Sequence, residues 1–255
     1  MSRSRWRGRP TGRWSPLAAA ARSSSRRSTL SRQLAPIDKS ELVRAGNALG
    51  LRETPMLTDD GFSDSAVLKR TDLDQFQVLH FATHGLTEGQ WGCAKSPPAL
   101  VTSMGDAGSD GILSFNEIAR LRLDANLVVL SACETASALS QSEARAAGQE
   151  EAGNTLEGLV RAFLAANARA VLTTYWPISD EGESEALIEN FYRAARSGTI
   201  GDALQNAQLA IMNERASSHP IYWGAFFVVG DANKALISGP AQAQLVGGTT
   251  AASGR

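Results

Sequence analysis

The chain has 255 residues, with 25 basic and 26 acidic side chains and 43% hydrophobic residues, a composition typical of one globular domain. No apolar run approaches the roughly 18 to 20 residues that a bilayer-spanning helix needs, which excludes a transmembrane segment. Cys93 and Cys133 are too few for a secreted disulfide scaffold, so we expect a reducing, cytoplasmic location.

The near-neutral total hides a charge asymmetry. Residues 1–37 contain nine arginines and no acid, so the remainder has a net charge of -10. Such an Arg- and Ser-rich segment buries little apolar surface, and we expect it to be disordered and unnecessary for folding. An arm for nucleic acid or an acidic partner, a transit peptide, a linker and a misassigned start remain alternatives. The folded domain is then predicted at 38–237, with a flexible tail at 238–255.

Helices and buried strands alternate from about residue 38. Helical spacing is found in 37–51, and Ser63 is positioned to cap a helix that runs through Lys69 toward Leu73. A capping box at Ser114 and Glu117 predicts a short helix. Strands are predicted at 77–83, 127–132, 170–176 and 225–230, and further helices at 155–166, 180–198 and 199–216.

Strands separated by helices indicate an α/β fold with a mostly parallel central sheet and helices on both faces. In such sheets, sites form at the carboxyl ends of the strands. Thr83-His84-Gly85 follows the first predicted strand, and Ala132-Cys133-Glu134 ends the second, 49 positions later. The two side chains, His84 and Cys133, are therefore expected at one edge of the sheet.

These residue types together suit nucleophilic catalysis. A thiol needs a neighbouring base to ionise at neutral pH, and a histidine is the usual one. Gly85 allows a close backbone approach, so its amide is suited to an oxyanion hole. Taken singly, a strand-end cysteine is more often a small buried hydrophobe and a strand-end histidine more often structural. Their combination favours chemistry, and their order is also the caspase order.

Several segments together resemble the CHAT domain, a caspase-related module often found behind TPR repeats. The resemblance covers about residues 40–235 and is carried by VLHFATHG (78–85), GILSFNEIARLRL (111–123), VVLSACETA (128–136), LEGLVRAFLAANARAVLTTYWPISD (156–180), FYRAARSG (191–198), ALQNAQLAIM (203–212) and HPIYWGAFFVVGD (219–231). It implies a caspase-like three-layer sandwich in which His84 is the general base and acid, Cys133 the nucleophile and Gly85 an oxyanion-hole donor, with the Cys133 amide as the second donor.

The chain departs from the family pattern in three places. Typical members have AGA where this chain has Ala166-Asn167-Ala168, and LW at Tyr175-Trp176. The Arg-rich segment also stands where TPR repeats usually precede the domain.

The expected partners are a protein or peptide substrate and a TPR or other sensor protein. We expect no membrane association, and no nucleic acid is required by the folded domain. The sequence does not indicate the oligomeric state.

The third predicted strand should flank the cysteine strand, which makes Trp176, Ser179 and Asp180 candidates for the substrate-pocket wall. The main alternative for Asp180 is a cap on the following helix. Glu134 is better explained as a surface acid than as an orienter of His84.

No cofactor is expected, and the histidines and cysteines lack zinc-ligand spacing, so no metal is expected either. His80 is predicted to be a core residue, and His219-Pro220 with Tyr222-Trp223 is given a structural role.

Two other classes of protein are alternatives to a cysteine peptidase. Residues 107–111 approach the G-x-S-x-G elbow of α/β-hydrolases but lack its first glycine and a preceding strand. A non-enzymatic interaction module with a caspase-like shell is the stronger alternative. The long polar loop at 134–154 is predicted to be mobile, as a regulatory or self-cleavage element.

Overall fold

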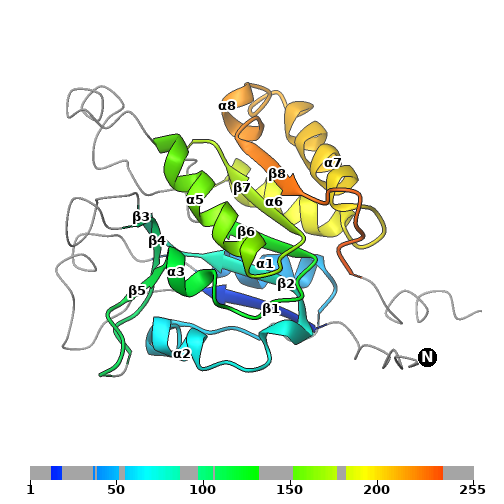
Figure 1. Ribbon diagram of the computed structural model, residues 1–255. Coiled ribbons are helices and arrows are strands. Elements are labelled where there is room, and N and C mark those ends of the chain that lie inside the picture. The colour runs from blue at the N-terminus through cyan, green and yellow to red at the C-terminus, as the bar shows by residue number, and fades with distance from the viewer. Residues whose placement is uncertain are drawn as a thin grey trace, which may run out of the picture.

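The computed structural model describes residues 13–18, 37, 39–51, 55–86, 97–105, 107–131, 152–176 and 182–237. A five-stranded sheet forms the centre of the described part (Figure 1). Its strand order is β1-β2-β6-β7-β8; the first four are parallel, and β8 runs antiparallel to β7. The strands are β1 (Arg13–Ala18), β2 (Phe76–Ala82), β6 (Leu127–Ser131), β7 (Ala170–Thr174) and β8 (Phe226–Gly230).

Helices cover both faces of this sheet. One face packs against α2 (Asp64–Leu68), α3 (Phe115–Ile118) and α5 (Ala152–Ala165). The other packs against α1 (Ser40–Ala48), α6 (Glu183–Ala194) and α7 (Ile200–Met212). Among the described residues, the remaining helices are α8 (Pro220–Trp223) and two 3-10 turns, Asp59–Gly61 and Leu73–Gln75. The predicted three-layer α/β architecture is confirmed.

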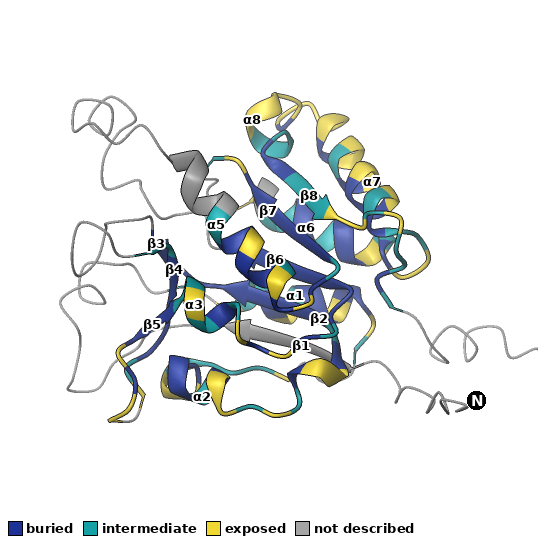
Figure 2. Ribbon diagram, in the orientation of Figure 1, coloured by how far each residue is buried: buried dark blue, intermediate teal, exposed yellow. Residues whose placement is uncertain are grey.

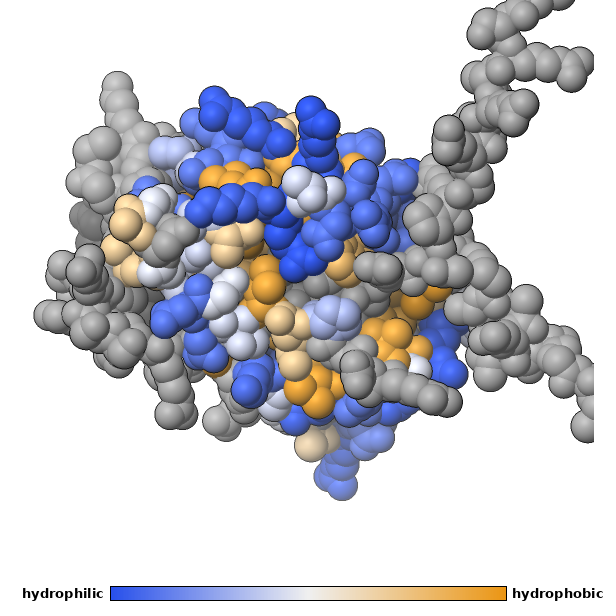
Figure 3. Space-filling model, turned by 90° about the horizontal axis from the view of Figure 1, so that it is seen from below, coloured by the Kyte–Doolittle hydropathy of each residue, from blue (hydrophilic) through white to orange (hydrophobic). Residues whose placement is uncertain are grey.

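The two apolar cores follow from side-chain alternation along the strands. In β2, Leu79 and Phe81 enter the core with α5, whereas Val78 enters the core with α6. Burial on both faces explains the nearly continuous apolar sequences of β2, β6 and β7, and Figure 2 shows these strands in the buried interior. Figure 3 shows the molecule from below the view of Figure 1. On this face hydrophilic residues predominate among the coloured ones, and apolar residues form smaller patches.

A second, antiparallel sheet adjoins the carboxyl end of β2. It consists of β3 (Gly85–Leu86), β4 (Ala99–Val101) and β5 (Ile112–Ser114). The sequence did not predict these strands, because segments of two or three residues carry no period to detect. Their effect is to turn the chain out of the main sheet immediately after His84.

Most predicted elements form, with shifted ends. Ser63 caps α2 by accepting from the Ala66 amide at 3.1 Å, although the helix ends at Leu68. The capping box also forms, with Glu117 accepting from the Ser114 amide at 2.8 Å. The helix predicted to start at Asp180 begins at Glu183 instead, after a Gly182 N-cap with φ of 72°.

The central sheet is mostly parallel, as predicted, and β8 pairs antiparallel with β7. Another expectation is wrong in part. The segment 1–37 was expected to be disordered, but its residues Arg13–Ala18 form β1 and pair with β2 over Phe76–Ala82. Much of the predicted mobile loop at 134–154 lies outside the described residues. In the described part, no helix combines the length and apolarity needed to cross a membrane.

Candidate active site

His84 sits where the chain passes from the main sheet into the small one. Its side chain is buried, and its carbonyl oxygen accepts from the Val101 amide at 2.7 Å. Thr83 is held on both sides: its amide donates to the Ser131 carbonyl at 3.3 Å, and its hydroxyl donates to the Val101 carbonyl at 2.5 Å. Gly85 follows as the first residue of β3 and pairs with Leu100. These bonds fix the backbone around the predicted base and oxyanion donor.

The end of β6 lies directly beside the end of β2. The parallel register pairs His80 with Val129 and Ala82 with Ser131. Ser131 is the last described residue before Ala132-Cys133, and Ala82 is two residues before His84. The last described residue before Cys133 therefore lies beside the strand end that precedes His84.

A buried polar cluster links this edge to the helices. His80 is 0% exposed, and its Nε2 lies 3.1 Å from Ser131 Oγ and 3.1 Å from Glu41 Oε1. Ser131 Oγ donates to Glu41 Oε1 at 2.6 Å, and Tyr192 Oη lies 3.1 Å from His80 Nδ1. We call these four residues, Glu41, His80, Ser131 and Tyr192, the His80 cluster.

Only one member of the His80 cluster could be predicted from the sequence. The prediction that His80 is a core residue is confirmed by its burial. Its three partners were missed, because they lie on α1, β6 and α6, far apart in the sequence. The available signal was a histidine inside an apolar strand, since a buried imidazole needs hydrogen-bond partners.

The charge of Glu41 is set by its partners. Burial raises the pKa of this carboxyl, but hydrogen bonds from His80 and Ser131 and the charges of His80 and Arg44 together lower it below its ordinary value. Arg44, one turn along α1, pairs with Glu185 of α6. Glu41 is therefore a carboxylate at neutral pH.

Trp176 follows the carboxyl end of β7 and is partly buried. Its indole Nε1 donates to the Ile221 carbonyl of α8 at 3.2 Å. His219 caps α8 by accepting from the Ile221 amide at 3.2 Å, and Trp223 Nε1 donates to the Ser218 carbonyl at 3.1 Å. These contacts agree with the structural role predicted for this segment, and they place Trp176 at the same sheet edge as His84.

The structure does not describe the other predicted site residues. Cys133, Glu134, Ser179 and Asp180 lie outside the described residues, as does Cys93. Among the described residues, no three His, Cys, Asp or Glu side chains gather in a way that could hold a metal ion.

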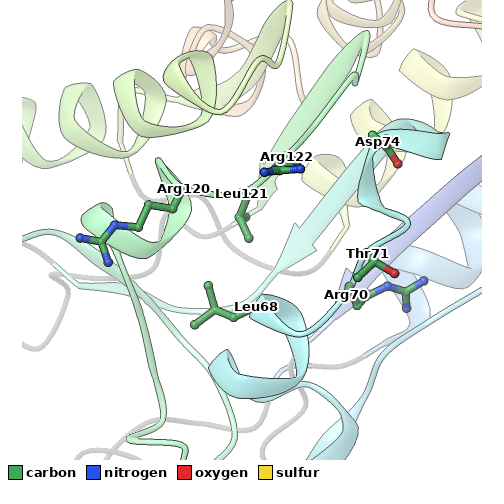
Figure 4. Close-up of a pocket in the computed structure, with 7 residues that line it drawn as sticks. All are labelled: Leu68, Arg70, Thr71, Asp74, Arg120, Leu121 and Arg122. Carbon is green, nitrogen blue, oxygen red and sulfur yellow. The ribbon is translucent and has the colours of Figure 1, made fainter.

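A surface pocket of about 320 Å³ lies away from this edge (Figure 4). Its lining residues precede β2 or β6, so they mark the amino-terminal edge of the sheet; they are Leu68, Arg70, Thr71, Asp74, Arg120, Leu121 and Arg122. Arg70 is already paired with Asp72. Figure 4 shows the guanidinium groups of Arg70 and Arg120 extending to opposite sides. The pocket therefore does not converge positive charge on one point.

The sheet order, its helical layers and a buried histidine at the end of β2 define a three-layer α/β protein with a candidate site at the carboxyl edge. The chain belongs to the CHAT domain family, whose model matches residues 2–231. This match includes β1 and begins earlier than the resemblance predicted over 40–235.

Two curated relatives are similar to this chain. Tetratricopeptide repeat protein 28 of Mus musculus is 31% identical over 188 residues, and that of Homo sapiens is 29% identical over 191 residues. Each alignment covers 62% of this chain and 7% of the relative. The chain thus corresponds to a small part of these longer proteins.

Two solved structures are also similar. The Arg-specific cysteine proteinase gingipain R aligns with a TM-score of 0.46 and 10% identity, covering 89% of this chain and 50% of that one. The Drosophila initiator caspase Dronc aligns with a TM-score of 0.39 and 12% identity, covering 86% and 80%. The architecture itself is established by the strand order and layers described above.

Proposed function

We propose that this protein is a cysteine endopeptidase in which His84 and Cys133 form a catalytic dyad. The observation that carries the proposal is the β2–β6 register, which pairs Ala82 with Ser131. A chain advances at most about 3.6 Å per residue. His84 follows Ala82 by two residues, and Cys133 follows Ser131 by two residues. Chain length alone therefore keeps the Cα of each within about 7 Å of the Cα of its own paired residue. Membership of the CHAT family supports the same assignment.

The proposed reaction follows from these residue types. His84 takes the thiol proton of Cys133. The resulting thiolate attacks the peptide carbonyl carbon, a C–S bond forms, and the carbonyl oxygen becomes an oxyanion. Backbone amides of Gly85 and Cys133 donate to that oxygen. The C–N bond then breaks as His84 gives a proton to the leaving amine. Water then attacks the thioester carbon and gives a proton to His84, and the C–S bond breaks, which releases the carboxylic acid product and restores the Cys133 thiolate.

Substrate recognition is proposed at the neighbouring strand end. Trp176 contributes an aromatic wall beyond β7, and Ser179 and Asp180 follow it in sequence. An ionised Asp180 in this wall would favour a basic side chain on the residue before the scissile bond. Control by a TPR or other sensor partner is part of the proposal, because the curated relatives are tetratricopeptide repeat proteins. The cytoplasmic location stays a prediction.

An electrophilic peptide probe directed at cysteine tests the dyad. We expect mass spectrometry to map the adduct to Cys133, and we expect His84→Asn to lower the labelling rate by about 100-fold or more. His219→Asn is the matched control, because His219 is exposed and asparagine is also a good N-cap.

Two outcomes would contradict the peptidase. Equal labelling of Cys93 and Cys133, unchanged by His84→Asn, would show that no dyad exists. Labelling of Cys133 without any cleavage difference between wild type and Cys133→Ala, compared by mapping new protein N-termini, would favour the interaction module instead.

A further inference from the structure

The His80 cluster lies between four elements of the fold. Apolar side chains at this position would avoid the free-energy penalty of burying polar groups. Its members come from α1, β2, β6 and α6, and both His80 and Tyr192 are 0% exposed. Val78 and Val129, on the same face of the sheet, belong to the apolar core. Burying an imidazole and a carboxylate among such groups is often less stabilising than burying hydrophobic residues of similar volume. The presence of the His80 cluster in this core therefore indicates a role besides packing.

The hydrogen bonds of the cluster fix where its protons lie. The Ser131 hydroxyl has one proton, which it donates to the Glu41 carboxylate at 2.6 Å. The close contacts of His80 Nε2 with Ser131 Oγ and Glu41 Oε1 then require that Nε2 carry a proton and donate. Nδ1 of His80 lies 3.1 Å from Tyr192 Oη, so it can accept from that hydroxyl when the ring is neutral or donate to its oxygen when the ring is charged. The donation from Nε2 holds in both states of the ring.

The cluster converges on Ser131. Its hydroxyl contacts both Glu41 and His80, while its carbonyl oxygen accepts from the Thr83 amide at 3.3 Å. Side chain and backbone of this one residue are thus both held. Ser131 is two residues before Cys133 in the sequence, and Thr83 directly precedes His84.

We propose that Glu41, His80 and Tyr192 are positioning residues that act through Ser131 to hold the end of β6 in place for the dyad. The inference deepens the proposed function and rests on it for the role of Cys133. Helices α1 and α6 then do more than cover the sheet, because each contributes a side chain that fixes the strand end. The Arg44–Glu185 ion pair joins these two helices next to the cluster.

The test compares variants that remove single hydrogen bonds. We expect Ser131→Ala and Glu41→Gln each to lower the rate of Cys133 labelling by the peptide probe by about tenfold or more, since small misplacements of reacting groups have effects of this size. Glu189→Gln is the matched control for Glu41→Gln, because it removes an exposed ion pair with Arg193 on α6. It should change the rate less than about twofold.

A second pair of variants separates positioning from packing. His80→Gln keeps an N–H donor for Glu41 and Ser131, whereas His80→Leu keeps only the volume. We expect the glutamine variant to retain more labelling than the leucine variant, although leucine suits an apolar core better. Urea unfolding of each variant shows which of them fold.

The pH dependence of alkylation by iodoacetamide provides a readout that does not need peptidase activity. In Ser131→Ala, we expect the midpoint for Cys133 to move toward that of Cys93, which serves as an internal reference in the same chain. If the midpoint moves in Ser131→Ala but not in His84→Asn, the dyad fails and the positioning role stands. If folded Ser131→Ala and Glu41→Gln match wild type in labelling rate and midpoint, the positioning role is overturned.

Discussion

Glu41 illustrates how one partly buried carboxylate depends on its neighbours. The side chain is 21% exposed and lies beside His80 and Ser131, with Arg44 one turn further along α1 and Tyr192 on the opposite side of the imidazole. Desolvation favours the protonated acid, whereas each of the donors and cations favours the carboxylate. Because the second group of effects is larger, the pKa of Glu41 is lower in the folded chain than in the unfolded chain.

A lowered pKa makes the stability contribution of Glu41 depend on pH. The contribution is complete above the ordinary value of 4.5 and is lost as the pH falls through the lower folded-state value. We expect Glu41→Gln to lower the free energy of unfolding by about 1 to 2 kcal/mol at pH 7. The difference from wild type should shrink as the pH falls below about 4.5, when measured by urea unfolding at a series of pH values.

Glu189→Gln again provides the control for this measurement. Its ion pair with Arg193 is exposed to solvent, so its loss should change stability by less than about 1 kcal/mol at any pH. A Glu41→Gln difference that stays constant from pH 7 to pH 3 would show that the carboxylate does not stabilise the fold through its charge.

Residues of the candidate site differ in how far the sequence could reveal them. His84 and Gly85 could be recognised because they directly follow an apolar strand; in the structure β2 ends at Ala82 and Gly85 begins β3. Tyr192 could not be linked to His80, since 112 positions separate them and only the packing of α6 brings them together. Local patterns identify residues at strand ends, whereas partners contributed by covering helices depend on tertiary packing.

Among the strands, those buried in the sheet interior could be predicted from their sequences. The strands β2, β6 and β7 have buried, β-branched or apolar sequences and were all identified from them. Strand direction is set by the path of the connection, so the same pattern could not reveal that β8 runs antiparallel. The Arg-containing β1 was missed because its composition resembles that of a disordered segment.

The end of β8 depends on a glycine. Gly230 has a φ of 109°, and a Cβ built there would lie 2.3 Å from the Arg169 carbonyl oxygen and 3.0 Å from the Ala170 Cα. The backbone of β7 cannot move away without breaking the Ala170–Gly230 pairing. We expect Gly230→Ala to lower the free energy of unfolding by about 2 to 4 kcal/mol, from backbone strain and overpacking together, measured in urea.

Gly61→Ala is the matched control for that substitution. Apart from its immediate surroundings in the chain, no atom lies within 4 Å of a Cβ added at Gly61, so stability should change by about 0.5 kcal/mol or less. Equal effects of the two substitutions would show that the close approach of β8 to Arg169 is relieved without cost.

At the scale of the whole molecule, the basic and acidic parts of the chain are not independent. Residues 1–37 contain nine of the basic side chains and no acid, yet their strand β1 pairs with β2 at Phe76 and from Val78 to Ala82. Strand β2 in turn leads into Thr83 and His84. The edge strand of the sheet therefore comes from the segment that the composition alone marked as unnecessary.

Deleting residues 1–37 should consequently destabilise the fold. The deletion leaves the backbone groups of β2 that face β1 without partners, and an unpaired strand edge also promotes association with other chains. We expect the free energy of unfolding to fall by about 2 kcal/mol or more, given several lost backbone hydrogen bonds, with increased light scattering. Deleting only residues 1–12 leaves β1 in place and should preserve wild-type stability. If the longer deletion also unfolds like wild type, β1 contributes nothing to the sheet and the domain begins near residue 38.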